Sequence, residues 1–168
     1  MEEILVFISV VILAMLLTIW RIRRVKCGKH RISRIPLGLS YQYMPMFPCY
    51  AETVSHYDLA DPSVWLVQDS CGHPEGIVLY TDVSGVLCIY AMEVIRCRQG
   101  SGIGTAIMRN LMSYGRMSGM DGLVVRAVNG TDGFYRACGM REIEYNGIVY
   151  FAKDLCGTPD WLRIVTSL

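Results

Sequence analysis

The sequence lacks an excess of charge of either sign. Its 16 lysine and arginine residues nearly balance 15 aspartate and glutamate residues, which leaves a formal net charge of +1 at pH 7. Proteins that bind nucleic acid mainly through phosphate contacts carry a clear surplus of positive charge. We therefore expect no nucleic-acid partner, and the length of 168 residues is about that of one domain.

The sequence also lacks paired cysteines. It has 7 cysteines, an odd number, and none of them form the C-x-x-C spacing that is typical of zinc and redox sites. This pattern argues against a disulfide framework, so we interpret the cysteines as reduced thiols that are mostly small and buried. No cluster of metal ligands and no Ser/His/Asp or Cys/His nucleophile spacing stands out, so we expect no metal site.

Charge is missing altogether from residues 4–20, which read ILVFISVVILAMLLTIW. At about 1.5 Å per residue, a helix of this length is near the lower limit for crossing the hydrocarbon core of a bilayer. A cleaved signal peptide is the first alternative, but it needs a basic start, and this chain begins with Glu2 and Glu3. A buried core helix is the second, but it normally shows a polar face, for which the run offers only Ser9 and Thr18.

We therefore predict one transmembrane helix within residues 1–24, in contact with the lipid bilayer through residues 4–20. Basic residues follow the apolar run, at Arg21, Arg23, Arg24, Lys26, Lys29, Arg31 and Arg34. Because basic flanks remain on the cytoplasmic side of membranes, the sequence predicts a single-pass membrane protein with its N-terminus outside and its folded domain in the cytoplasm.

We expect a linker and the start of the domain in residues 25–50, and the main domain in residues 51–168. The expected elements are a short helix over 51–59, strands over 64–69, 76–82, 86–95 and 123–128, and helices from 103 and from 132. The strand, helix and strand from 86 to 128 form a βαβ crossover with parallel strands. Asn146 and Gly147 mark a C-terminal hairpin. This order indicates a mixed α/β (α+β) fold.

Three glycines alternate where the expected strand gives way to the helix, in the run QGSGIGT at 99–105. A helix N-terminus has unpaired N–H groups and a partial positive charge, so a loop with few side chains favours the approach of a phosphate. An ordinary tight turn is the alternative. The dinucleotide fingerprint G-x-G-x-x-G and the Walker loop are both absent, which disfavours a nucleotide-binding domain of those classes.

The combination of motifs resembles the GCN5-related N-acetyltransferase (GNAT) family over about residues 64–155. The resemblance rests on Gln99-x-x-Gly102-x-Gly104 between a central strand and a helix, on Phe134-Tyr135-x-x-x-Gly139-Met140, and on the terminal hairpin. The chain departs from the family's pattern in having Asn129 six rather than seven residues before the tyrosine, and Arg96 where many members have proline.

The resemblance implies acetyl-CoA as the acyl donor. In the family, loop amides bind the pyrophosphate of coenzyme A, and the matching residues here are Gln99, Gly100, Ser101, Gly102, Ile103, Gly104 and Thr105. The positions that would serve the pantetheine arm are Val94, Ile95 and Arg96, with Asn129 as a further contact. Tyr135 matches the tyrosine that protonates the departing thiolate, and a packed aromatic ring is its alternative interpretation.

Two residues are candidates for the base that removes a proton from the attacking amine. Glu93 lies in the central strand between Met92 and Val94, and a carboxylate among apolar neighbours is suited to accepting a proton. Its alternative role is an ion pair with Arg96, Arg98 or Arg126. His56 is the second candidate, and a surface histidine near a helix end is the alternative there.

The function that follows is a membrane-anchored N-acetyltransferase, in which a primary amine of unknown identity attacks acetyl-CoA directly. The alternative is a non-catalytic acyl-CoA-binding or membrane-tethered interaction module on the same fold. The sequence does not distinguish between possible amine acceptors or oligomeric states.

Overall fold

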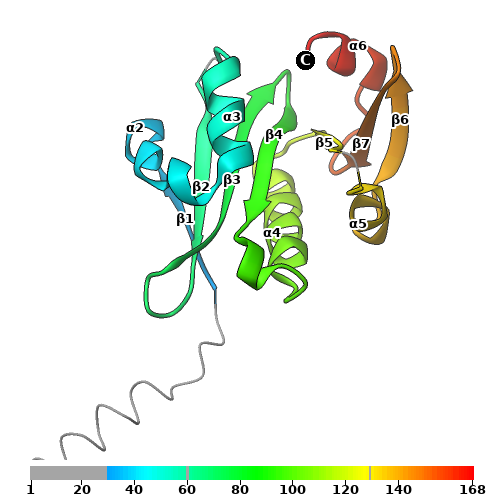
Figure 1. The fold of residues 1–168 in the computed structure, drawn as a ribbon. Coiled ribbons are helices and arrows are strands. Elements are labelled where there is room, and N and C mark those ends of the chain that lie inside the picture. Colours follow the sequence, from blue (N-terminus) through cyan, green and yellow to red (C-terminus); the bar gives the residue numbers. More distant parts are fainter. Residues whose placement is uncertain (1–29, 60, 129) are drawn as a thin grey trace, which may run out of the picture.

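The computed structural model describes residues 30–59, 61–128 and 130–168. A seven-stranded mixed sheet with the order β1-β2-β3-β4-β5-β7-β6 forms its centre (Figure 1). All neighbouring strands are antiparallel except β4 and β5, which are parallel. The strands are β1 Arg31–Ile35, β2 Ser63–Gln68, β3 Pro74–Val83, β4 Val86–Val94, β5 Gly122–Arg126, β6 Arg141–Tyr145 and β7 Ile148–Asp154.

Helices cover both faces of this sheet. They are α2 Leu37–Ser40, the 3₁₀ helix η1 Tyr41–Met46, α3 Pro48–His56, the 3₁₀ helix η2 Arg96–Arg98, α4 Ile103–Met117, α5 Asp132–Ala137 and α6 Trp161–Thr166. Helix α4 buries an apolar stripe that includes Ile107 and Leu111 against one face. Helix α3 packs on the opposite face over Ile77 and Leu79, and α6 packs beside β5 and β7.

The mixed α/β fold, the parallel pair around a long helix and the C-terminal hairpin are confirmed. The helix expected over 51–59 begins earlier, at Pro48, because proline at the first helical position has its φ angle already set for a helix. The interpretation of the cysteines as mostly buried is wrong, because Cys49, Cys71, Cys97 and Cys156 are exposed.

The predicted membrane anchor, residues 4–20, lies outside the described residues. Within 30–59, 61–128 and 130–168, no helix combines the length and the apolar character that a membrane span requires.

The edge between β4 and β5 opens halfway along β4. Pairing with β5 covers only Val86 to Ile89, and the rest of β4 runs on without this neighbour (Figure 1). On the other side of β4, the register with β3 shifts by one residue, because Leu79 pairs with Ala91 and Tyr80 pairs with Ile89. Tyr90 is therefore the extra residue of a β-bulge, a feature that bends a strand and increases its twist.

Candidate active site

The glycine loop adopts a backbone conformation that other residues enter only with strain. Gly100 has a φ of 76° and Gly102 a φ of 86°, and Gly102 is the N-cap of α4. A Cβ atom added to either glycine would meet nothing within 4 Å. These two glycines are therefore required for the left-handed turn itself, rather than for space.

Gly104 has a different role. A Cβ atom there would lie 3.3 Å from the ring of Phe134, which is tighter than an ordinary van der Waals contact. Phe134 in turn lies edge-on against Tyr135, with 5.1 Å between ring centroids. The missing side chain thus lets α5 approach the first turn of α4.

The start of α4 presents backbone N–H groups that have no acceptor among the described residues. These N–H groups belong to Gly100, Gly102, Ile103, Gly104 and Thr105, and the helical bonding begins only at Ala106, whose N–H donates to the carbonyl of Gly102 at 3.0 Å. No side chain caps the helix. Neighbouring N–H groups without acceptors and the positive end of a 15-residue helix favour the binding of an anion such as a pyrophosphate.

A buried carboxylate, that of Glu75, binds the segment that leads into this loop. Glu75, at the start of β3, is only 2% exposed. It accepts hydrogen bonds from Arg98 Nε at 2.6 Å and from His30 Nδ1 at 2.6 Å. The hydrogen bond to Glu75 raises the pKa of Arg98. The backbone carbonyl of Arg98 accepts a hydrogen bond from the Ser101 hydroxyl at 2.5 Å. Arg98 therefore contacts Glu75 through its side chain and the glycine loop through its backbone.

This arrangement was not predicted from the sequence. Glu75 lies 45 residues from His30 and 23 from Arg98 along the chain. An isolated glutamate at the start of an expected strand carries no local signal of such contacts.

The unpaired half of β4 offers backbone groups toward the open edge. The Ile95 N–H donates to the Glu75 carbonyl at 3.0 Å, so Ile95 faces β3. Because alternate residues of a strand point their backbone groups to opposite sides, the N–H groups of Val94 and Met92 face the β5 side. The Val94 carbonyl accepts from Gln99 Nε2 at 3.0 Å. Among the residues expected to serve a pantetheine arm, the geometry favours Val94 over Ile95, and Arg96 is exposed in η2.

Glu93 lies on the opposite face of β4 from α4. Its Oε2 atom accepts a hydrogen bond from the backbone N–H of Tyr50 at 3.1 Å, in the first turn of α3. Among the described residues it forms no ion pair with Arg96, Arg98 or Arg126, and Arg98 is instead paired with Glu75. Burial and the nearby charge of Glu93 raise the pKa of the Cys49 thiol.

Tyr135 is buried within α5. Its ring stacks on Phe151 with 5.4 Å between centroids, and 6% of the residue is exposed. Burial raises the pKa of Tyr135 to about 12, so the phenol is protonated at neutral pH. Its hydroxyl has no hydrogen-bond partner within the described chain. Asn129, the further contact expected for the cofactor, lies outside the described residues.

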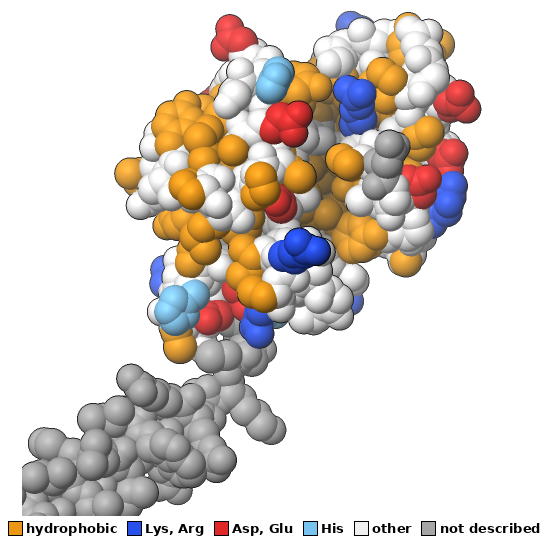
Figure 2. Space-filling model, viewed as in Figure 1, with side chains coloured by type: hydrophobic (Ala, Val, Ile, Leu, Met, Phe, Trp, Pro, Cys, Tyr) orange, Lys and Arg blue, Asp and Glu red, His pale blue; other side chains and the backbone are white. Residues whose placement is uncertain are grey.

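A cleft of about 690 Å³ lies between α3 and the end of β5. One wall is formed by α3 and the residue after it, and the other by the end of β5 and the chain that follows. The lining residues are Glu52, Thr53, His56, Tyr57, Tyr90, Arg126, Ala127 and Val128. Figure 2 shows a hollow between the part of the molecule that carries β1–β4 with α3 and the part that carries β5–β7, with groups of both charges at its rim.

The second candidate base lines this cleft. His56 Nδ1 lies 2.7 Å from the carbonyl of Glu52, an acceptor, so Nδ1 carries the proton in the neutral ring and Nε2 is left as the basic atom. The rings of Tyr57 and Tyr90 lie 5.6 Å apart beside it.

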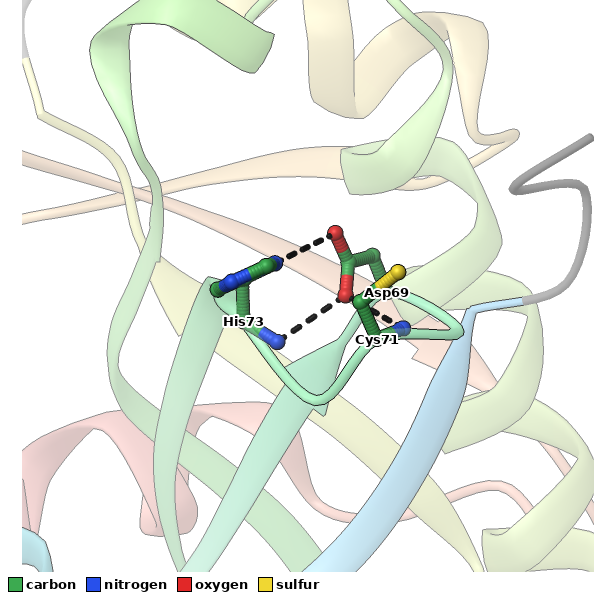
Figure 3. Close-up of side chains that lie close together, drawn as sticks. All are labelled: Asp69, Cys71 and His73. Atoms are coloured by element: carbon green, nitrogen blue, oxygen red, sulfur yellow. Dashed lines mark hydrogen bonds and ion pairs between the residues drawn. The ribbon is translucent and has the colours of Figure 1, made fainter. Parts of the chain in front are cut away.

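Three potential metal ligands lie together in the exposed turn between β2 and β3 (Figure 3). Ligand atoms of Asp69, Cys71 and His73 are within 4.8 Å of one another. The Asp69 carboxylate is already used within the turn, because it accepts from the N–H groups of Cys71 at 2.8 Å and His73 at 2.9 Å. These bonds, that of His73 first, lower the pKa of Asp69. The cluster is therefore explained by the geometry of the turn.

The fold is that of the GNAT acetyltransferases. No family model and no curated protein matches the sequence, but many solved structures match the fold. The IAA acetyltransferase from Bacillus cereus is 21% identical, with a TM-score of 0.56, over 76% of this chain and 100% of its own. The ribosomal-protein-S18-alanine N-acetyltransferase from Escherichia coli is 13% identical, with a TM-score of 0.61, over 79% and 97%. A GNAT family acetyltransferase from Elizabethkingia anophelis with acetyl-CoA bound is 14% identical, with a TM-score of 0.58, over 76% and 99%.

Proposed function

We propose that this chain is an acetyl-CoA-dependent N-acetyltransferase whose acceptor is a primary amine. The observation that carries the proposal is the set of free N–H groups at the start of α4, beside the half of β4 that β5 leaves unpaired. The pyrophosphate of coenzyme A would bind the N–H groups at the start of α4, and its extended pantetheine arm would lie along the unpaired half of β4. The acetyl-CoA bound to a protein of the same fold supports this choice of donor.

The residues divide the proposed reaction between them. The donor supplies a thioester whose carbonyl carbon is open to attack by an amine. The Val94 N–H is oriented to stabilise negative charge on the carbonyl oxygen, an effect of about 3 kcal/mol per donor in other acyl-transfer enzymes. Glu93, or His56 through Nε2, accepts the proton of the amine. The protonated hydroxyl of Tyr135 supplies a proton to the departing sulfur.

We also propose that residues 4–20 anchor the enzyme in a membrane with its folded domain in the cytoplasm. The support is the uncharged run followed by basic residues. Acetyl-CoA is a cytoplasmic metabolite, which agrees with this orientation. A domain tethered in this way meets membrane-bound acceptors at raised effective concentration.

The exposed cysteines provide a test of the anchor. We expect the full chain to resist extraction by alkaline carbonate. A maleimide that cannot cross membranes should label Cys71 and Cys97 in inverted vesicles but not in sealed, right-side-out ones. Extraction by carbonate would contradict the anchor, and labelling in right-side-out vesicles would contradict the orientation.

One observation favours the alternative of a binding module without catalysis. The Glu93 carboxylate accepts the Tyr50 N–H, and Tyr135 packs within the core, so both candidate catalytic groups also have structural roles. Thiol release from acetyl-CoA separates the two functions. Full-length protein in mild detergent should release free CoA in the presence of a panel of primary amines. Binding of CoA without any release would favour the module, and absence of binding would contradict both.

A further inference from the structure

The 690 Å³ cleft between α3 and the end of β5 is the site that we assign to the acceptor, and its two walls carry opposite charges that form no ion pair with each other. Glu52 and His56 belong to the α3 wall, and Arg126 lies at the end of β5 on the other side. Within the described residues neither Glu52 nor Arg126 forms an ion pair, although both line the same 690 Å³ cleft. An exposed guanidinium without a carboxylate partner, inside a cleft, is available to a ligand.

The alternation of side chains along β5 places Arg126 on the face of the sheet away from α4. Val125 packs in the cluster beneath α4, whereas Val124 packs on the other face with Tyr150 and Trp161. Because side chains alternate along a strand, Arg126 shares the face of Val124, away from α4. The free N–H groups that would hold a pyrophosphate lie at the start of α4, so Arg126 is not placed to bind that group.

The bulge in β4 is followed by residues that face α3, the same face of the sheet as Arg126. Ala91 packs in the cluster under α3, and Tyr90 contacts that cluster, although they are neighbours in sequence. Glu93 follows on the α3 side, where it meets Tyr50. The α3 wall of the cleft therefore has the Glu52 carboxylate, which suits an ammonium group, and Glu93 lies under the same helix. The β5 wall has the Arg126 guanidinium, which suits an anion.

On the basis of the proposed function, we infer that the acceptor is a primary amine that also bears an anionic group, and that Arg126 binds this group. The amine lies toward Glu93 and the anion, a carboxylate or a phosphate, lies against Arg126. The apolar part of such an acceptor contacts the rings of Tyr57 and Tyr90, which line the same cleft.

Matched acceptors test this inference with the full-length chain. L-phenylalanine is compared with L-phenylalaninamide, and O-phosphoethanolamine with ethanolamine, by thiol release from acetyl-CoA. We expect kcat/KM to be about tenfold or more higher for the anionic member of at least one pair, as one charge-assisted hydrogen bond provides. The pair that shows the difference identifies carboxylate or phosphate as the anion.

Variants of Arg126 assign the effect to this residue. Arg126→Gln should remove the preference by raising KM for the anionic acceptor, and Arg126→Lys should retain part of it. KM for acetyl-CoA should not change in either. Arg109→Gln, on the exposed side of α4, is the matched control and should behave like the unaltered protein.

The outcomes separate this inference from the function on which it rests. Acetylation of the uncharged amines as fast as the anionic ones would overturn the inference and leave the acetyltransferase standing. A preference that persists in Arg126→Gln would also overturn it. No transfer to any amine would overturn the function and the inference together.

Discussion

The carboxylate of Glu93 binds the first turn of α3, the helix that forms one wall of the 690 Å³ cleft, since its Oε2 atom accepts the Tyr50 N–H at 3.1 Å. This contact ties the central strand to α3. Glu93 therefore holds in place the helix that lines the cleft, and in the proposed reaction it is also a candidate base.

Replacing Glu93 by glutamine separates these two roles. In Glu93→Gln the amide oxygen still accepts the Tyr50 N–H, so the free energy of unfolding should change by less than about 1 kcal/mol. If Glu93 is the base, kcat should fall by about 10²-fold or more. The loss should shrink at high pH, where solvent removes the proton from the amine.

The control is Glu93→Ala, which removes both the base and the cap and should also lower the melting temperature. An unchanged kcat in Glu93→Gln would assign only the structural role to this residue and would direct attention to His56, for which His56→Gln is the equivalent test.

Tyr135 should make the fold sensitive to alkali. Burial raises the pKa of Tyr135 to about 12, whereas an unfolded tyrosine titrates near 10. Between about pH 10 and 12 the unfolded chain loses this proton first, so stability falls as the pH rises through this window, by up to about 2–3 kcal/mol. Denaturant titrations at pH 9 and 11 should show a smaller decrease in Tyr135→Phe than in the unaltered protein.

The same variant tests catalysis at neutral pH. Tyr135→Phe keeps the stacked ring, so we expect kcat to fall by about tenfold or more while the melting temperature stays close to its original value. Equal kcat values for the two proteins would leave Tyr135 as a packed aromatic residue only.

Gly102 should be intolerant of a side chain because of its backbone angle. Gly102→Ala forces a residue with a Cβ atom into a φ of 86°, which costs about 1–2 kcal/mol and disturbs the N–H groups at the start of α4. We expect a lower free energy of unfolding and a higher Kd for CoA. Gly38→Ala, at an exposed glycine with an ordinary φ in α2, is the control and should be neutral or slightly stabilising. Equal effects of the two substitutions would contradict this explanation.

Arg98 should act on donor binding from a distance. Arg98→Ala leaves the carboxylate of Glu75 buried with only His30 as a side-chain partner, and it releases one end of the glycine loop. We expect KM for acetyl-CoA to rise about tenfold with a much smaller change in kcat, because misplacement away from the chemistry weakens positioning. Arg109→Ala is the control. A change in kcat alone would contradict a positioning role.

The sequence predicted the centre of the fold because the local and tertiary signals agree there. The strand expected over 86–95 is β4 at Val86–Val94, and the apolar spacing of α4 matches the residues that it buries. β1 was not predicted as a strand, since it reads RISRI and sits at a half-exposed edge within the basic flank. α6 was not predicted either, although Asp160, whose carboxylate accepts from the Arg163 N–H, is a recognisable N-cap signal.

The sequence also indicated the glycine loop, but it explained only part of why glycine is needed at each position. Glycine spacing indicated a phosphate site, whereas the structure shows that Gly102 serves the turn and Gly104 serves the packing of Phe134. The contact of Glu75 with Arg98 and the bulge at Tyr90 could not be predicted. Both depend on strand register, which follows from the whole sheet rather than from neighbouring residues.

Calorimetric titration of the full-length protein tests the central claim most directly, that free backbone amides at the start of α4 bind a pyrophosphate. CoA and pantetheine share the arm that would lie along β4, but only CoA carries the pyrophosphate. We predict saturable 1:1 binding of CoA and at least tenfold weaker binding of pantetheine. Equal affinity for the two compounds, or no heat with CoA, would contradict the account.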